Sequence, residues 1–214
     1  MTLNLSVDEV LTTTRSVRKR LDLEKPVPRG VLLECLELAI QAPTGSNAQG
    51  WQWVFVEDAD KKKAITDIYR EGADWYRQMP RAEYPEGDIR GERMDLVTDS
   101  ALYLADHLHE VPVLLIPCLQ GRVEKMPHLS SSFWASLFPA AWSFCLALRS
   151  RGLGSCWTTF HLLGDGEKRV AEILGIPYEQ YSQGGLFPIA YTRGTDFRPA
   201  KRLPVDQIVH WDNW

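Results

Sequence analysis

The feature that most constrains the fold of this chain is a nearly uninterrupted apolar run over residues 111–119. A strand with one solvent-exposed face alternates between apolar and polar residues. An apolar run without that alternation is typical of a strand buried on both faces. We therefore expect residues 111–119 to form a central strand, in a sheet that carries helices on both sides.

Helical and strand patterns alternate around this run. Apolar residues recur at helical spacing in several segments, and short apolar or alternating runs separate them. The predicted helices cover residues 7–14, 28–40, a segment after the potential N-cap Asp58, 96–108, 131–150 and 167–174. The further predicted strands cover residues 51–56, 152–160 and 185–192. This alternation predicts one α/β or α+β sheet covered by helices.

Composition is typical of a single globular domain. The 214 residues are 44% hydrophobic and 24% charged, which suffices for one core over residues 1–214. The net charge of −4 implies no broad basic surface, so nucleic acid is not an expected partner. The start lacks the pattern of a signal peptide, and the apolar stretch 133–148 is too short to span a bilayer. We expect a cytoplasmic protein without a membrane partner.

The cysteines and histidines form no recognisable disulfide or metal pattern. The four cysteines include no Cys-x-x-Cys pair and lie in apolar segments, so we expect buried, reduced thiols. His107 and His109 are two residues apart on a predicted helix, where their side chains diverge. We expect no metal site, and we interpret all five histidines as structural or surface residues.

Two segments lack the periodicity of the rest. Residues 79–93 are charged and rich in proline and glycine, which indicates an exposed loop or lid. A linker would have a similar composition, but the flanking segments do not resemble separate domains. The tail from residue 197 begins with a basic pair, Lys201 and Arg202, and ends in aromatic residues that include Trp211 and Trp214.

Three separated segments carry residues suited to binding a phosphate and a flat heterocycle. The first is Arg15-Ser16-Val17-Arg18, in which two guanidinium groups and a hydroxyl follow a short predicted helix. Arginine binds phosphate or an electron-rich ring through charge-assisted hydrogen bonds. Taken alone, this segment is more typical of a solvated basic turn.

The second segment is the loop over residues 42–51, with the sequence Ala-Pro-Thr-Gly-Ser-Asn-Ala-Gln-Gly-Trp. Its small residues let a backbone approach a flat ligand, and Asn47 and Gln49 supply amide donors and acceptors. The third combines Gly-Leu-Gly-Ser-Cys-Trp-Thr-Thr at residues 152–159 with Lys201 and Arg202, whose charges can neutralise a terminal phosphate.

Taken in order, these motifs resemble the nitroreductase family of FMN-dependent flavoproteins. The shared pattern is Arg-Ser-x-Arg near the start, Ala-Pro-Ser/Thr-x-x-Asn-x-Gln-x-Trp after the second helix, Gly-Leu-Gly-Ser/Thr-Cys-Trp at the third strand, and a basic residue before the C-terminal arm. The resemblance covers residues 7–204. The chain has Gly50 where the family usually has proline, and Thr44 where serine is frequent, and neither change removes a charged ligand.

The resemblance implies an α+β fold with a central, mostly antiparallel sheet flanked by helices, in an intertwined homodimer with two FMN sites at the subunit interface. Residues 204–214 would be a dimerisation arm. The basic turn and the C-terminal basic pair would hold the phosphate and ribityl chain, and residues 157–159 would lie near N5 of the ring. The implied FMN contacts are Arg15, Ser16, Arg18, Trp157, Thr158, Thr159, Lys201 and Arg202 from one subunit, and Pro43, Thr44, Gly45 and Asn47 from the other.

The resemblance also implies an oxidoreductase, in which NADH or NADPH reduces FMN by hydride transfer and a nitroaromatic, quinone or similar small molecule then reoxidises it. The flavin carries the chemistry, so we expect no catalytic acid, base or nucleophile among the side chains. Arg18, at the N1 and O2 edge, would stabilise the negative charge of the reduced ring. Dehydrogenation and dehalogenation are also possible, since the same scaffold supports them.

Two alternatives lie outside this class. The chain could be a flavin-binding or sensing protein without turnover. The run over residues 153–157 also partly matches the loop around a papain-type nucleophile, which would make Cys156 the nucleophile of a cysteine hydrolase. In the papain arrangement, however, the His and Asn lie far downstream of the Cys, and Cys156 is too near the C-terminus for that spacing.

Overall fold

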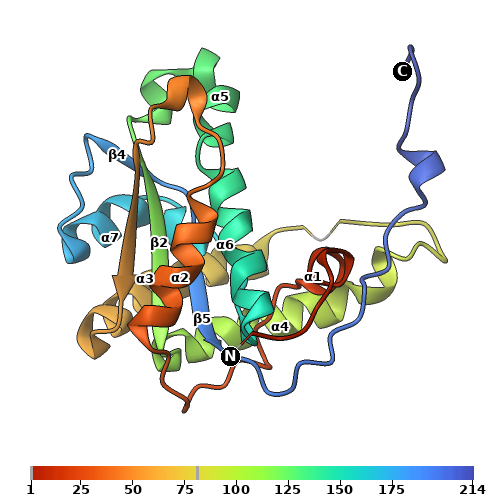
Figure 1. The fold of residues 1–214 in the computed structure, drawn as a ribbon, viewed down its shortest axis with the longest axis horizontal. Coiled ribbons are helices and arrows are strands. Elements are labelled where there is room, and N and C mark those ends of the chain that lie inside the picture. Colours follow the sequence, from red (N-terminus) through yellow and green to blue (C-terminus); the bar gives the residue numbers. More distant parts are fainter. Residues whose placement is uncertain (1, 81) are drawn as a thin grey trace.

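The apolar run predicted as a central strand forms β2 (Val113–Gln120), and the rest of the sheet is assembled around it. The computed structural model describes residues 2–80 and 82–214 (Figure 1). β2 pairs with β1 (Trp51–Val56), β4 (Tyr181–Gln183) and β5 (Phe187–Tyr191), and β5 also pairs with β3 (Leu153–Gly154). All four pairings are antiparallel, and the strand order is β1-β2-β5-β3 with β4 also on β2.

β2 is central because both of its faces are covered. Every residue of the strand except Gln120 is buried. Its side chains alternate between two hydrophobic clusters: Leu114 and Ile116 pack on one side of the sheet, and Val113 and Leu115 pack on the other. The prediction of a strand buried on both faces is confirmed.

Helices form a layer on each face of the sheet (Figure 1). The layer over Leu114 and Ile116 consists of α3 (Ala59–Gln78), α4 (Met94–His107) and α7 (Gly166–Leu174). The opposite layer consists of α2 (Arg29–Ala39) and α6 (Phe138–Ser150), with α1 (Val7–Thr13) packed against α6. This is the predicted α+β fold, with a central antiparallel sheet flanked by helices.

The predicted helix over residues 131–150 is interrupted. It consists of α5 (Ser130–Ala135) and α6, separated at Ser136 and Leu137. Pro139 has no N–H to donate to the carbonyl of Ala135, and a proline ring clashes with the helical carbonyl four residues before it. A continuous helix therefore cannot form across this point.

The helical stretch Pro127–Ser150 is long and apolar enough to cross a membrane by length and composition, with a mean hydropathy of 1.3. It is longer than the run over 133–148 that the sequence pattern singled out. Its apolar side chains are used in the protein core, since Phe144 and Leu148 of α6 are fully buried in the cluster against the sheet.

The prediction of a strand over residues 152–160 is wrong beyond Gly154. Only Leu153 and Gly154 join the ladder, as β3. The chain then leaves β5 and makes isolated bridges from Ser155 to Ser16 and from Thr158 to Leu186. β4 was not predicted at all, because three residues are too few to show a period. The predicted strand over 185–192 is confirmed in the shorter form of β5.

Helix termini follow simple capping chemistry. Asp58 accepts a hydrogen bond from the backbone N–H of Lys61 (2.9 Å) and so begins α3, as predicted. Ser6 and Glu9 form a capping box that begins α1. Gly175 takes a left-handed conformation (φ 70°) directly after α7, where a residue with a Cβ is disfavoured.

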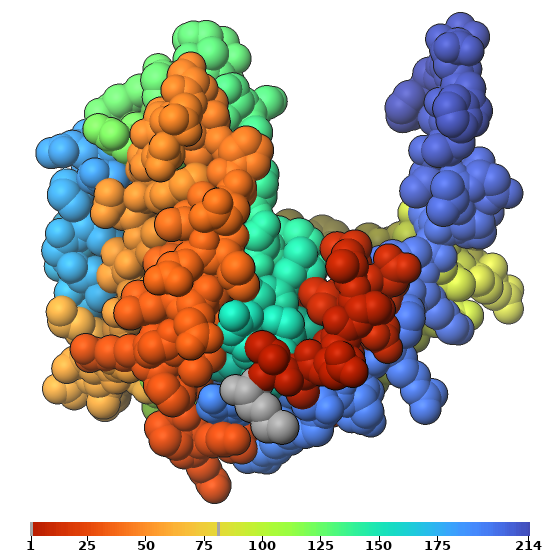
Figure 2. Space-filling view, in the orientation of Figure 1, coloured from red at the N-terminus to blue at the C-terminus, as the bar shows by residue number. Residues whose placement is uncertain are grey.

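The two aperiodic segments lie outside the layers. Residues 82–90 contain no helix or strand, and a short 3₁₀ turn, Gly91–Arg93, leads into α4. Arg81 of the predicted lid falls outside the described residues. The C-terminal segment stands apart from the body of the protein, with a hollow between the two (Figure 2). Its side chains Trp211 and Trp214 are exposed to solvent, at 83% and 102% of the reference accessible area for tryptophan. The roles of these segments as lid and dimerisation arm stay predictions.

Gly72 of α3 lies against the 3₁₀ turn Phe160–Leu162, and a Cβ there would come within 2.2 Å of the carbonyl oxygen of Phe160. We expect Gly72→Ala to lower the free energy of unfolding by about 1–3 kcal/mol, because backbone must move to admit the methyl group. Gly30→Ala in α2 is the matched control, since its Cβ would meet no atom within 4 Å. Urea denaturation compares the two variants, and equal stability would contradict this packing.

Candidate functional site

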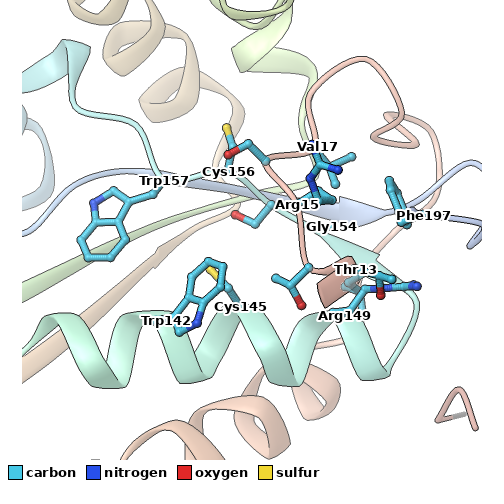
Figure 3. A pocket seen from close by; sticks show the side chains of 14 residues that line it. Thr13, Arg15, Val17, Trp142, Cys145, Arg149, Gly154, Cys156, Trp157 and Phe197 are labelled. Carbon is cyan, nitrogen blue, oxygen red and sulfur yellow. The ribbon is translucent and has the colours of Figure 1, made fainter. Parts of the chain in front are cut away.

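The N-terminal basic turn and the segment after β3 meet in one pocket. The backbone N–H of Val17 donates to the carbonyl of Ser155 (2.8 Å), and Ser16 pairs with Ser155 in an isolated parallel bridge. A pocket beside this contact has a cavity volume of about 50 Å³ and opens to solvent. Residues 13–17 and 153–157 line it, together with Trp142, Cys145, Arg149 and Phe197 (Figure 3).

Positive charge gathers beside this pocket. Burial and the nearby charges of Arg202 and Arg93 lower the pKa of Arg15, because three guanidinium groups lie close together. Arg15 donates to the carbonyl of Arg198 on the C-terminal segment (2.8 Å). Within residues 2–80 and 82–214, none of the three arginines forms an ion pair with a carboxylate. Such a cluster favours an anion with several oxygen atoms.

The basic pair at the C-terminal segment is divided between two environments. Lys201 lies 3.5 Å from the carboxylate of Glu92, whereas the Arg202 guanidinium donates to the backbone carbonyl of Lys201 (3.2 Å) and to no carboxylate in the described chain. Arg93 joins Arg202 and Arg15 from the turn before α4. Sequence reasoning missed Arg93, because it belongs to a charged segment in which no single arginine stands out.

Two buried donors favour a polar ligand in the pocket. The Ser155 hydroxyl and Nη1 of Arg149 are buried without a hydrogen-bond partner among the residues described, and both residues line the pocket. Arg149 is otherwise fixed, since Nε donates to the Thr13 hydroxyl (3.1 Å) and Nη2 to the carbonyl of Thr195 (3.0 Å). A buried polar group without a partner costs free energy, so a ligand that offers hydroxyl or phosphate oxygens fits these atoms.

Arg18 lies in a hollow next to the pocket and does not line the pocket itself. Its Nη1 donates to the hydroxyl of Ser100 in α4 (3.3 Å), and Lys19 and Phe197 also line this hollow. The charge of Arg18 also acts on the buried Cys156 thiol, whose pKa it lowers against the larger effect of burial. The basic turn therefore supplies one guanidinium to the pocket and a second to the hollow beside it.

The three consecutive residues predicted near the ring differ in how they are held. Trp157 lines the pocket and donates from Nε1 to the carbonyl of Gly184 (2.9 Å). Thr158 exchanges two backbone hydrogen bonds with Leu186 (3.0 and 2.8 Å), and its hydroxyl lies 2.7 Å from the Tyr69 hydroxyl. The Thr159 side chain is exposed and makes no hydrogen bond with the described residues, so it is available to a ligand.

The predicted loop at residues 43–47 does not reach the pocket of its own chain. Its 3₁₀ turn, Gly45–Asn47, packs beside α5, where the N–H of Gly45 donates to the hydroxyl of Ser136 (3.0 Å) (Figure 1). The Thr44 hydroxyl accepts a backbone hydrogen bond within the loop (3.2 Å). Pro43 and Asn47 are exposed. One chain thus brings together the basic turn and residues 153–157, but not this loop.

Cys156 lacks the surroundings of a catalytic nucleophile. Its side chain is 2% exposed, and burial raises the pKa of its thiol to about 11. Nucleophilic cysteines instead have lowered pKa values and partial exposure. His161 is fully buried as well, and burial lowers its pKa to about 3. These environments disfavour the cysteine hydrolase alternative.

All four cysteines are buried and unpaired, so we expect the native thiols to resist alkylation. Iodoacetamide at pH 8 should label all four thiols in denaturant and leave the native protein unlabelled over the same time, as counted by mass spectrometry. Rapid, stoichiometric labelling of native Cys156 at pH 8 would contradict the buried, unreactive state of this thiol. It would then favour the cysteine hydrolase alternative.

Known proteins share this sequence pattern and fold. The model of the nitroreductase family matches residues 11–191. A protein named NADH dehydrogenase from Thermus thermophilus is 30% identical over 92% of this chain and 91% of its own length. A 4-nitrobenzoate reductase from a Nocardioides species is 29% identical over 96% and 90% of the two chains.

A solved structure is also similar. It is an iodotyrosine deiodinase bound to FMN and 3-iodo-L-tyrosine, which is 25% identical to this chain with a TM-score of 0.71 and covers 98% of this chain and 100% of its own. The family match extends over most of the chain and includes the basic turn, the central sheet and the segment after β3. The protein therefore belongs to the nitroreductase family.

Proposed function

We propose that this protein is an FMN-dependent oxidoreductase that uses NADH or NADPH to reduce a small oxidised substrate, such as a nitroaromatic or a quinone. The observation that carries the proposal is the cluster of Arg15, Arg93 and Arg202 beside a pocket. Among the described residues, the three arginines form no ion pair with a carboxylate, and the buried Ser155 hydroxyl of the pocket has no hydrogen-bond partner. A ligand that joins a phosphate, a chain of hydroxyls and a flat ring satisfies these groups together. The FMN in the similar deiodinase structure is such a ligand.

At the phosphate end, the proposed contacts are electrostatic. Arg15 and Arg202 donate to the phosphate, Arg93 adds a third charge, and Lys201 lies at the margin of the cluster. Ser16 and Ser155 line the pocket, and their hydroxyls would contact the ribityl chain. These residues bind and orient the cofactor, and they take no part in electron transfer.

At the ring end, the residues tune and shape the site. FMN supplies the hydride chemistry when it is bound. Arg18, in the hollow beside the pocket, would supply a fixed positive charge near the N1 and O2 edge of the ring and so favour its reduction. Trp157 lines the pocket, and Thr158 and the exposed side chain of Thr159 follow it in sequence and would lie on the N5 side of the ring. No side chain acts as a nucleophile or as a general acid or base in this proposal.

We further propose that a second copy of the chain completes each site. The loop at residues 43–47 is exposed beside α5 and lies away from the pocket of its own chain. Large apolar side chains are exposed both on the C-terminal segment, at Trp211 and Trp214, and beside the pocket, at Trp142. Exposed apolar groups of this kind mark protein interfaces. In the proposed homodimer, the loop at residues 43–47 of one subunit covers the flavin of the other. Residues 204–214 pack against the surface of the partner subunit.

Reductive dehalogenation is the second candidate function. It is favoured by the similarity to the iodotyrosine deiodinase, which extends over nearly the whole chain. The segment at 79–93 is suited to select between substrates, since it is charged and most of its described residues are exposed. The two candidates share the cofactor and the source of electrons, and they differ in the molecule that reoxidises the flavin.

Anaerobic titration of the FMN-loaded protein with NADH and with NADPH tests the proposal. We expect at least one nucleotide to bleach the flavin absorbance, and nitrofurazone or menadione to restore it. Reduction by dithionite but by neither nucleotide would contradict the proposed activity and favour a flavin-binding protein without turnover. Restoration by 3-iodo-L-tyrosine, and not by the other acceptors, would favour dehalogenation.

Replacing Arg202 tests the phosphate contact separately. Arg202→Ala should weaken FMN binding about tenfold, because one charge-assisted hydrogen bond to the phosphate is lost. Binding of riboflavin, which has no phosphate, should change little. Arg169→Ala is the matched control, since Arg169 pairs with Glu71 between α7 and α3. Calorimetric titration gives both affinities. An equal loss of FMN and riboflavin binding would contradict a contact between Arg202 and the phosphate.

A further inference from the structure

A pair of hydroxyls in the core connects helix α3 to the proposed ring site. Tyr69 of α3 is 1% exposed, and its hydroxyl lies 2.7 Å from the hydroxyl of Thr158. Thr158 stands between Trp157, which lines the pocket, and Thr159, which is exposed. A phenylalanine would fill the same volume as Tyr69 without burying a polar atom, so the phenol oxygen is the atom that needs an explanation.

The ring of Tyr69 also holds the segment that follows. It packs against Phe160 with ring centroids 5.1 Å apart, and Tyr76 packs against the same ring at 5.1 Å. Thr159 therefore lies between two fixed neighbours, Thr158 and Phe160, and Tyr69 contacts both of them. The two backbone hydrogen bonds between Thr158 and Leu186 hold the other side of the segment.

The hydroxyl pair also lies close to other groups of the site. Burial and the nearby Cys156 raise the pKa of Tyr69, while the charge of Arg18 acts in the opposite direction. The phenol therefore keeps its proton at physiological pH and can donate it in a hydrogen bond. Tyr69 thus contacts Thr158, on the proposed N5 side of the ring, and the charge of Arg18 reaches its phenol.

We propose that Tyr69 is a positioning residue of the flavin site, which fixes residues 157–159 against the N5 side of the ring through its hydrogen bond to Thr158. This inference rests on the proposed FMN-dependent function. Tyr69 itself does not touch the cofactor. It sets the position of Thr159 and the orientation of the Thr158 hydroxyl. Both affect how readily the bound flavin accepts electrons.

Tyr69→Phe removes only the phenol oxygen and keeps the ring against Phe160. We expect a shifted midpoint potential of the bound FMN and a reduction by NADH or NADPH that is slower by about three- to tenfold. FMN affinity should change by less than about threefold, because the phosphate contacts are untouched. Tyr76→Phe is the matched control: Tyr76 packs on the same Phe160, and its hydroxyl makes no hydrogen bond with the described residues. The Tyr76→Phe variant should have the same flavin midpoint potential and the same rate of reduction by NADH or NADPH as the wild type.

A double-mutant cycle with Thr158→Val separates positioning from general stability. If the hydroxyl pair acts as a unit, each single variant shifts the potential to a similar extent and the double variant shifts it no further. A lowered melting temperature of Tyr69→Phe with an unchanged potential and reduction rate would overturn the positioning role and leave the proposed function intact. A wild-type protein that binds no FMN would overturn both.

Discussion

The candidate site depends on one backbone contact between distant parts of the chain. The N–H of Val17 donates to the carbonyl of Ser155 at the point where the chain leaves the β3 ladder. This bond turns the N-terminal basic segment toward the residues that follow β3, so that Arg15 and Ser16 line the same pocket as Trp157. A regular strand over residues 152–160 would occupy these backbone groups within the sheet and leave the basic segment as a solvated turn.

The pocket formed in this way carries an electrostatic cost. The lowered pKa of Arg15 reflects its burial and the repulsion from Arg202 and Arg93, and the donors of Arg149 and Ser155 are buried without partners among the described residues. A ligand that binds only the folded state stabilises it, and one that also removes repulsion and satisfies buried donors does so strongly. The same features that weaken the free protein thus favour a phosphate-bearing, hydroxyl-rich ligand, which is the basis for proposing FMN.

Local and periodic signals were predictable from the sequence, and contacts between distant segments were not. The apolar run at 111–119 and the helical periodicities predicted β2 and helices on both sides of the sheet, because each signal lies within one segment. The choice of α+β over α/β came from the family resemblance. The irregular path of residues 155–159 depends on the bridge between Ser155 and Ser16. No pattern within residues 152–160 indicates that contact, because Ser16 lies far away in the sequence. Motif order identified the basic turn, but Arg93 and Tyr69 were missed because only their positions in space, beside Arg15 and Thr158, give them a role.

FMN retention by the purified protein is the most direct measurement. The protein is incubated with excess FMN, passed through a gel-filtration column, and its visible absorption spectrum is recorded together with its concentration. Binding at the pocket described above predicts a yellow protein that retains one FMN per chain. A correctly folded but colourless protein that releases all of its FMN on the column would contradict the assignment of this pocket, and with it the proposed activity.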